Sequence, residues 1–374
     1  MFIGMDATRA NKPRKTGVEW YAYHVIQELK KLTVTDGNSW ILYSNALLTN
    51  GLEVLPENWY EDRLRWPLPL GWTQVALSLE LRKRPIDVLW MPGSTLPRIH
   101  PRRLVVTVHD IGFHHHPELY PRRQVTIHER SMREIAKRAE RILTVSEFTA
   151  RDLAESYGID TKKIAITPCG IDHERYRPIA SASTIDDCLT RYRVSRPYFL
   201  VVGRLETKKN LLTLIRAWEQ LKTRRGVGDP HHLVIVGTPG HGSDEVFRAI
   251  QRSPVKSDFL HLGYLPEVDL PALMNGAVAL VHPSLFEGFG IPPVQAMACG
   301  TPVIASNVAS IPEICGDAAL YADPKSPEAF AVLMDQLIQD GSKRRAMQLA
   351  GLERARSYTW KATAEKTLPV LADW

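Results

Sequence analysis

Hydrophobic positions along the chain follow two alternating spacings. Short runs of apolar residues, typical of buried strands, give way to segments in which apolar residues recur every three or four positions, typical of helices with one buried face. The first pair is a strand at 2–5 and a helix from Gly17 onward, whose apolar positions are Val18, Tyr21, Ala22, Val25, Ile26, Leu29 and Leu32. Strands that alternate with helices in this way predict parallel sheets with helices on both faces.

This alternation occurs as two series with a break between them. The strands predicted in the first series are Phe2–Met5, Trp40–Tyr43, Ile86–Met91, Leu104–Val108, Ile142–Val145 and Ile164–Thr167. Those predicted in the second series are Tyr198–Val202, Leu233–Val236, Phe259–Leu262, Val278–Val281 and Pro302–Ala305. The 374 residues fit two domains, each of about 150–200 residues.

We therefore predict an α/β fold of two doubly wound, Rossmann-like domains. The first spans 1–178 and the second spans 194–357, and the stretch 176–193, with its small polar residues, is the predicted linker. Because open α/β sheets bind ligands beyond the carboxyl ends of their strands, we expect the active site in a cleft across which the two domains face each other.

Composition narrows the class of protein. A hydrophobic content of 44% and a charged content of 24% are those of a soluble globular protein. We find no apolar run near the roughly 20 residues of a membrane-spanning helix, and the first residues lack the pattern of a secretory signal. The cysteines are far apart and form no C-x-x-C pair, which argues against a zinc site or a disulfide framework and favours the cytoplasm: Cys169, Cys188, Cys299 and Cys315.

The formal charge of +6 is unevenly distributed. Residues 1–178 hold 26 Lys/Arg against 21 Asp/Glu, whereas the remainder hold 21 against 20. This surplus is either a solvated basic face or a surface for anionic lipid headgroups and phosphorylated acceptors, which would place the protein on the inner face of the cell membrane. No recognition motif accompanies the charge, so we expect no nucleic-acid partner.

The first segment with a chemical signature is Gly203-Arg-Leu-Glu-Thr-Lys-Lys-Asn210, which follows a predicted strand and precedes a helix. Gly203 lets the backbone approach a ligand closely, and a helix start offers free N–H groups to an anion. Arg204 adds a planar guanidinium that fits phosphate oxygens, and Lys209 adds a mobile positive charge. The segment suits a diphosphate, although a loop of solvated charges has the same composition.

The second segment is His282-Pro-Ser-Leu-Phe-Glu-Gly-Phe-Gly-Ile-Pro-Pro-Val-Gln-Ala-Met-Ala-Cys-Gly-Thr-Pro-Val-Ile304, which reads as strand, glycine-rich turn, helix and strand. Glu287 lies just past the strand end, where a carboxylate can accept hydrogen bonds from two sugar hydroxyls. Gly288 and Gly290 leave room for a ligand beside the backbone. A helix-capping glutamate is the alternative, which the length of the pattern makes a poor explanation.

Together, Gly-Arg-x-x-x-x-Lys-Asn and Glu-Gly-Phe-Gly-x-Pro-x-x-x-Ala-Met-Ala-x-Gly-x-Pro-Val-Ile resemble the retaining glycosyltransferase family 4, which has the GT-B fold. The resemblance implies that Arg204 and Lys209 bind the donor diphosphate and that Glu287 binds a hydroxyl of the transferred sugar. Looser similarities cover most of the chain, and in this family the last helix, here about 358–374, crosses back to the first domain. The other residues implied at the donor site are Gly17, His109, Gly203, Gly263, Tyr264, Gly288, Phe289 and Gly290.

The resemblance also assigns places to several of these residues. Gly17 would lie near the phosphates and His109, at a strand end, near the sugar ring. The backbone around Gly263 and Tyr264 would meet the base. One position departs from the family: a second glutamate, which contacts the ribose, is replaced by Gln295. An amide still accepts a hydrogen bond, so ribose binding can persist, but the donor preference is left open.

A metal site is one interpretation of three consecutive histidines, His114-His115-His116. Consecutive histidines point in different directions, and no helical His/Asp/Glu set completes a site, so a surface or acceptor-facing cluster is the preferred interpretation. We expect no metal or other cofactor, with the nucleotide sugar as co-substrate.

Three other functions share this architecture. A nicotinamide-dependent oxidoreductase would need G-x-G-x-x-G after its first strand, and this motif is missing there. A sugar-nucleotide epimerase would act on the donor without an acceptor, and a silent sugar- or nucleotide-binding protein would have lost the phosphate cations or Glu287. The sequence favours mannose from GDP-mannose through general similarity to bacterial polysaccharide mannosyltransferases, while UDP-, dTDP- and ADP-sugars stay open. The expected acceptor is a saccharide or a lipid-linked saccharide.

Overall fold

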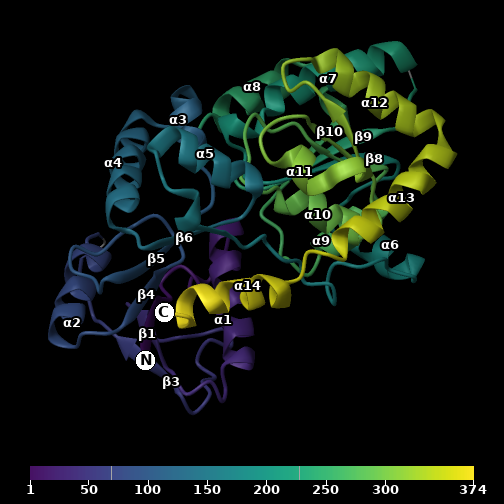
Figure 1. Cartoon of the computed structure of the whole chain (residues 1–374). Coiled ribbons are helices and arrows are strands. Elements are labelled where there is room, and N and C mark those ends of the chain that lie inside the picture. The colour runs from purple at the N-terminus through teal and green to yellow at the C-terminus, as the bar shows by residue number, and fades with distance from the viewer. Residues whose placement is uncertain (69, 227) are drawn as a thin grey trace. The chain divides into compact units, whose positions relative to one another are not determined.

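The computed structural model describes residues 1–68, 70–226 and 228–374. The chain forms two compact units, each described below by itself. Unit 1 comprises Met1–Pro117, Arg122–Gly170 and Thr359–Trp374, and unit 2 comprises Glu118–Pro121 and Ile171–Tyr358 (Figure 1).

Unit 1 contains a seven-stranded parallel sheet with strand order β3-β2-β1-β4-β5-β6-β7. Ile3 of the first strand, which is third in this order, pairs with Trp40 on one side and Val88 on the other. The inner strands are buried on both faces, as the continuous apolar runs predict. The strands are β1 Phe2–Asp6, β2 Ser39–Ser44, β3 Trp59–Arg63, β4 Val88–Met91, β5 Arg103–Val108, β6 Arg141–Thr144 and β7 Ile164–Ile166.

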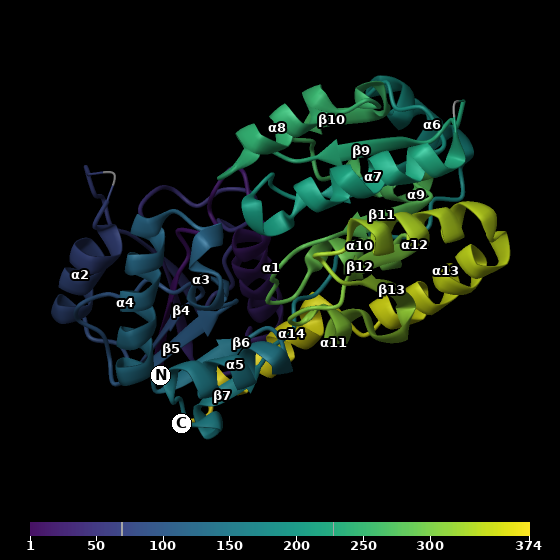
Figure 2. The ribbon, with the colours of Figure 1, turned by 90° about the horizontal axis from the view of Figure 1, so that it is seen from above.

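Helices cover both faces of this sheet. The first helix, α1, lies beside α14, the last helix of the chain, as Figures 1 and 2 show. Their ends are set by side-chain caps: Thr16 and Glu19 form a capping box at α1, and the hydroxyl of Thr359 accepts from the N–H of Ala362 at α14. The helices of unit 1 are α1 Gly17–Leu32, a π-helix at Trp72–Leu77, α2 Ser78–Lys83, α3 Gly112–His115, α4 Arg122–Arg138, α5 Glu147–Tyr157 and α14 Trp360–Ala372.

Unit 2 contains a six-stranded parallel sheet with strand order β10-β9-β8-β11-β12-β13. Its strands are β8 Tyr198–Val202, β9 His232–Val236, β10 Phe259–Gly263, β11 Ala279–His282, β12 Val303–Ser306 and β13 Ala319–Ala322. Its helices are α6 Ala182–Arg191, α7 Leu211–Arg225, α8 Ser243–Arg252, α9 Leu270–Gly276, α10 Ile291–Ala298, α11 Ile311–Cys315, α12 Pro327–Gln339 and α13 Gly341–Ala355.

Two helical layers enclose the sheet of unit 2. Helices α7 and α12 lie side by side on one face, and α9, α10 and α13 lie on the other (Figures 1 and 2). On the α7 face, Phe199, Trp218 and Phe330 are fully buried in one apolar cluster. This packing fixes the strand ends from which the loops of the site extend.

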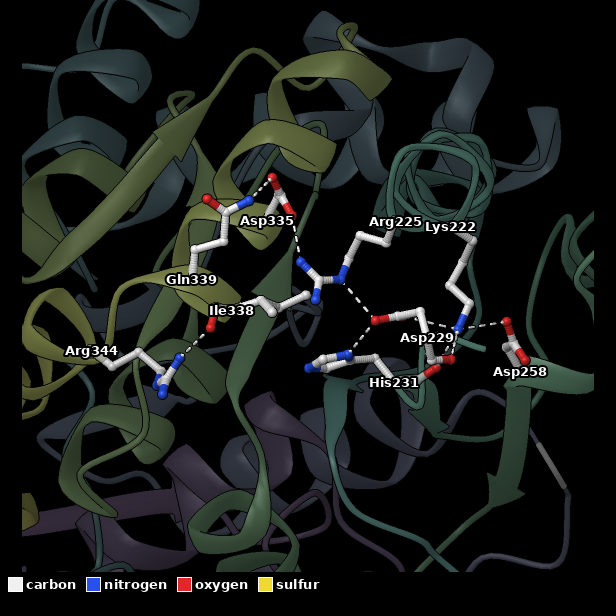
Figure 3. A network of polar contacts seen from close by, with 9 residues as sticks. All are labelled: Lys222, Arg225, Asp229, His231, Asp258, Asp335, Ile338, Gln339 and Arg344. Carbon is white, nitrogen blue, oxygen red and sulfur yellow. Dashed lines mark hydrogen bonds and ion pairs between the residues drawn. The ribbon is translucent and has the colours of Figure 1, made fainter. Parts of the chain in front are cut away.

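A buried polar network closes the edge of the sheet at the amino ends of β9 and β10 (Figure 3). Nζ of Lys222, at the end of α7, lies 3.1 Å from both Oδ2 of Asp229 and Oδ2 of Asp258. Arg225 pairs with Asp229 at 2.7 Å and with Asp335 of α12 at 3.0 Å. The network therefore ties α7 to both strands and to α12.

The structure confirms two doubly wound parallel sheets. Two of the edge strands, β3 and β13, were not predicted from the sequence, and the predicted linker contains the helix α6. No helix in the described ranges is long and apolar enough to cross a membrane.

Candidate active site

Strands β8 and β11 are neighbours in the sheet of unit 2, and the chain leaves them in opposite directions, toward β9 and toward β12. Such a switch in strand order opens a crevice at the carboxyl ends of the two strands, where α/β proteins bind their ligands. The loop 203–210 follows β8 and the loop 283–290 follows β11. Both segments singled out in the sequence thus meet at this one point.

A buried carboxylate with two partners occupies the crevice. Nζ of Lys209 donates a hydrogen bond to Oε1 of Glu287. Nε2 of His282, the last residue of β11, lies 3.1 Å from the same oxygen and 3.2 Å from Oγ of Ser284. Glu287 is 7% exposed and His282 is 2% exposed, so these groups interact with little screening by water.

Electrostatics keeps Glu287 ionised. Burial alone would raise the pKa of Glu287, but the positive charge of Lys209 and the hydrogen bond from His282 outweigh it and hold the pKa well below its usual range. Burial lowers the pKa of His282, which is therefore neutral near pH 7 and donates through Nε2–H. A fixed carboxylate of this kind is suited to accept hydrogen bonds from hydroxyl groups of a ligand.

The cations of the first loop line a small pocket beside this carboxylate. Gly203, Arg204 and Lys209 contribute to its wall together with His282 and Ser284. Gly203 has φ of 149°, and the side chain of Lys209 lies where a Cβ on Gly203 would make contact. The Arg204 side chain is 57% exposed, with its guanidinium 3.2 Å from Glu206. Positive charge therefore reaches the pocket from one exposed and one largely buried side chain.

The turn after Glu287 presents backbone donors. The N–H groups of Gly288, Phe289 and Gly290 are on buried residues and have no hydrogen-bond partner within the described ranges. Gly290, with φ of 94°, is the N-cap of α10. Buried amides are normally paired, so three consecutive unpaired ones at a helix start form a cradle for an anionic or polar ligand.

The other unit 2 residues that were predicted from the sequence lie at different distances from Glu287 along the sheet. Gln295 lies in the second turn of α10, and Phe289 packs edge-on against Tyr358 with ring centroids 5.3 Å apart. Gly263 ends β10 with φ of 67°, and Tyr264 is 50% exposed. Because β9 separates β10 from β8, Gly263 and Tyr264 lie further along the strand ends than the ionic cluster.

Two predicted residues belong to unit 1. Gly17 is the first residue of α1. His109 follows β5, its Nε2 lies 3.1 Å from the carbonyl oxygen of Pro92, and its ring packs edge-on against Tyr21 of α1. Burial lowers the pKa of His109, so this imidazole is neutral and its Nε2–H is used by Pro92.

The histidine run of unit 1 is engaged with carboxylates. Nδ1 of His114 lies 2.7 Å from Glu129 and Nε2 of His115 lies 2.5 Å from Asp152. Among the residues that the structure describes, no group of three or more His, Cys, Asp or Glu side chains is arranged to hold a metal ion.

Comparison with known proteins identifies the family. Residues 191–354 match the family described as Glycosyl transferases group 1, and residues 15–175 match Glycosyltransferase Family 4. The O-antigen chain mannosyltransferase B of Escherichia coli is 33% identical over 267 residues, which cover 71% of this chain and 69% of that protein. The chain is a family 4 glycosyltransferase.

The fold of this glycosyltransferase is GT-B. WaaG, a glycosyltransferase involved in lipopolysaccharide biosynthesis, superposes with a TM-score of 0.76 at 16% identity over 100% of both chains. Anabaena HepE in complex with UDP-glucose gives a TM-score of 0.74 at 18% identity over 100% of this chain and 99% of that one. At these identities the likeness concerns the fold, and the chemistry rests on the residues above.

Three polar groups of the glycosyltransferase site were missed in the sequence. His282 and Ser284 stand in an apolar context that reads as core. Ser310, after β12, fixes the backbone of Glu287: its Oγ donates to the Glu287 carbonyl oxygen at 2.9 Å. The loop after β9 was missed too, although its glycines 237, 240 and 242 were a readable signal. A Cβ on Gly237 would lie 1.8 Å from the carbonyl oxygen of Gly203, so this glycine allows the two loops to touch.

Proposed function

We propose that this glycosyltransferase transfers mannose from GDP-mannose to a saccharide or lipid-linked saccharide in cell-surface polysaccharide synthesis, with retention of the anomeric configuration. The observation that carries the proposal is the cluster of Glu287, Lys209 and His282 beside three unpaired backbone amides in the described part of unit 2. The choice of mannose is supported by the mannosyltransferase that matches over most of the chain.

The two halves of the cluster suit the two halves of a nucleotide sugar. Arg204, Lys209 and the amides of 288–290 offer positive charge and hydrogen-bond donors to a diphosphate. Glu287 accepts hydrogen bonds from hydroxyls of the sugar, and Gln295 binds the ribose through its amide. The backbone at Gly263 and Tyr264 meets the base, while Gly17 and His109 contact the phosphates and the sugar ring.

The reaction replaces the bond from the anomeric carbon to the phosphate oxygen by a bond to the acceptor oxygen on the same face of the sugar. The acceptor proton passes to the leaving phosphate oxygen, so no separate protein base is needed. Lys209, Arg204 and the amides stabilise the charge that grows on the diphosphate, which is the role of preorganised donors in catalysis. These cations act in place of a metal ion, and we propose that transfer requires none.

We propose that the enzyme binds its acceptor at a membrane surface. Residues 1–178 carry most of the net positive charge of the chain, which attracts anionic headgroups. We therefore place the enzyme in the cytoplasm, peripherally on the inner face of the cell membrane.

A panel of GDP-, UDP-, dTDP- and ADP-linked sugars without added metal tests the proposal. GDP-mannose is expected to raise the melting temperature and to release GDP slowly, as water replaces the acceptor. Stabilisation and hydrolysis with another nucleotide only would overturn the donor assignment. If a donor stabilises the protein but no product forms with any acceptor, the chain is a binding protein without catalytic activity. Interconversion of donor sugars would indicate an epimerase.

A further inference from the structure

A loop of unit 1 exposes two leucine side chains close to backbone groups that are hydrogen-bonded. It connects β3 to the π-helix and reads Arg63-Leu-Arg-Trp-Pro-Leu-Pro-Leu-Gly-Trp72, and we call it the leucine loop. Leu68 is 60% exposed and Leu70 is 75% exposed; position 69, between them, lies outside the described residues. Loops that face water are normally polar, so two exposed leucines so close together need an explanation outside the core.

The ends of the leucine loop are fixed by hydrogen bonds. Nε1–H of Trp66 donates to the carbonyl oxygen of Leu70 at 2.8 Å, and Nε1–H of Trp72 donates to that of Leu64 at 2.9 Å. The N–H of Leu64 donates to the carbonyl oxygen of Ser44, at the end of β2, at 2.8 Å. The two indole hydrogen bonds thus hold the backbone at Leu64 and Leu70, while the side chains of Leu68 and Leu70 stay exposed.

Positive charge accompanies the leucines. Arg63 and Arg65 are exposed, and neither has an ion-pair partner in the described part of the chain. Helix α2, which continues from the π-helix, ends in the exposed Arg82 and Lys83. The nearby carboxylates of Asp62 and Glu80 are both paired with Arg84. The leucine loop itself therefore carries two exposed cations whose charge no ion pair offsets among the described residues.

We propose that the leucine loop inserts Leu68 and Leu70 into the interface of an anionic lipid bilayer, with Arg63 and Arg65 on the headgroups. An apolar tip beside an indole and arginines is the composition of interfacial membrane anchors, because the leucines leave water while the guanidinium groups stay at the charged surface. A protein partner would use the same leucines, but charge complementarity singles out a surface of phosphate headgroups. The inference goes beyond overall charge and names the residues that enter the lipid.

The test uses the full chain in flotation with vesicles of phosphatidylglycerol and phosphatidylcholine, compared with pure phosphatidylcholine. Leu68→Ser with Leu70→Ser is expected to lower the partition coefficient on anionic vesicles by roughly tenfold or more. Arg63→Gln with Arg65→Gln is expected to lower it by roughly fivefold for each arginine and to weaken its salt dependence. Leu349→Ser, at a leucine 58% exposed in α13 of unit 2, is the matched control and is expected to bind as the wild type does.

Insertion is measured directly with a fluorophore. The native cysteines Cys169, Cys188, Cys299 and Cys315 are buried, so an environment-sensitive thiol dye labels Leu70→Cys selectively, with Leu349→Cys as control. A blue shift on anionic vesicles at position 70 only is expected. No vesicle binding, binding that ignores the leucine changes, or no blue shift at position 70 would overturn the proposal. If the wild type forms a concentration-dependent dimer that the leucine variant does not form, the membrane proposal is also overturned, and a second copy of the chain is the partner.

Membrane insertion of the leucine loop and the proposed transfer reaction can be contradicted independently of each other. In vesicle-free solution the leucine variant is expected to hydrolyse donor at the wild-type rate, because the loop contributes no residue to the donor site. A chain that binds vesicles through the loop but turns over no donor would contradict the transfer reaction and leave the membrane contact standing.

Discussion

Nε2 of His282 lies 3.1 Å from Oε1 of Glu287, at a point where both side chains are almost completely removed from water. His282 ends β11, and Glu287 follows five residues later in the turn toward α10. Together with Lys209 from the neighbouring loop, the imidazole restrains one oxygen of the carboxylate and so sets the direction of the other. The position of Glu287 is thus set by the sheet through His282, by the first loop through Lys209 and by Ser310 through the backbone.

Replacing His282 tests whether this restraint matters for catalysis. His282→Leu removes the donor, and kcat/KM for the donor sugar is expected to fall by about 10- to 100-fold, the range of a hydrogen bond to a charged group. His282→Gln keeps an N–H group and is expected to retain most of the activity. Steady-state kinetics and the melting temperature are measured together, because a variant that folds poorly would lose both. Wild-type kcat/KM in a folded His282→Leu protein would contradict the positioning role.

Much of the fold could be predicted because the buried strands and the capped helices leave strong local patterns. Helix α5 has such a pattern at both ends, since Ser146 caps its start and Gly158 ends it in a left-handed conformation. Strand β3 could not be recognised, because its charged residues 61–63 make this edge strand look like a polar loop. Helix α6 was read as linker from its small polar residues, but its buried Ile185, Cys188 and Leu189 follow a helical spacing.

The candidate site could be predicted only residue by residue. Glycines, cations and a glutamate in two loops indicated a diphosphate and a sugar, but the ion pair between Lys209 and Glu287 joins residues 78 positions apart. That contact depends on β8 and β11 being neighbours, which no local pattern reports. His282 was not recognised because an imidazole at the end of an apolar strand looks like a core residue until its partner is known.

Lys209 is expected to be the most sensitive cation of the site. In the proposed reaction Lys209 faces the growing charge of the diphosphate, so turnover of Lys209→Ala is expected to fall by about 10²–10³-fold, as with the loss of a preorganised donor. Lys209→Arg keeps the charge and is the matched control for the position. Single-turnover rates with saturating donor measure the chemical step. Unchanged turnover in Lys209→Ala would remove Lys209 from the catalytic machinery.

The low pKa of Glu287 predicts a pH dependence of stability. Because the folded-state pKa lies well below the usual value near 4.5, ionised Glu287 stabilises the native state fully above about pH 4.5, and this contribution is lost as the pH falls below that value. Glu287→Gln lacks it. The difference in free energy of unfolding between wild type and Glu287→Gln is therefore expected to be constant above about pH 5 and to shrink below about pH 4.5, as urea titrations at several pH values would measure. A difference that stays constant down to about pH 3 would contradict the assignment.

Gly237 is expected to tolerate no side chain. A Cβ there would lie 1.8 Å from the carbonyl oxygen of Gly203, and the residue has φ of 150°. Gly237→Ala is thus expected to push the two loops apart, lowering the melting temperature and weakening donor binding together. Gly228→Ala, at a glycine with positive φ of 97° and no atom within 4 Å of the added Cβ, controls for backbone strain. Equal losses in the two variants would show that strain, not the contact with Gly203, is the cause.

The network at the opposite edge of the sheet is expected to affect stability and not the site. Lys222 is 8% exposed and holds Asp229 and Asp258 (Figure 3). Lys222→Met leaves Asp258 without this cation, whereas Asp229 keeps Arg225, and the change is expected to destabilise the protein by about 1–3 kcal/mol. Arg224→Ala breaks an exposed pair with Glu328 and is expected to cost less than about 1 kcal/mol. Urea unfolding measures the free energy of unfolding of both variants.

Donor affinity in folded Lys222→Met is expected to match the wild type, because the network lies at the amino ends of β9 and β10 while the site lies at the carboxyl ends of β8 and β11. A loss of donor affinity equal to that of the site variants would mean that the sheet transmits the change from one edge to the other.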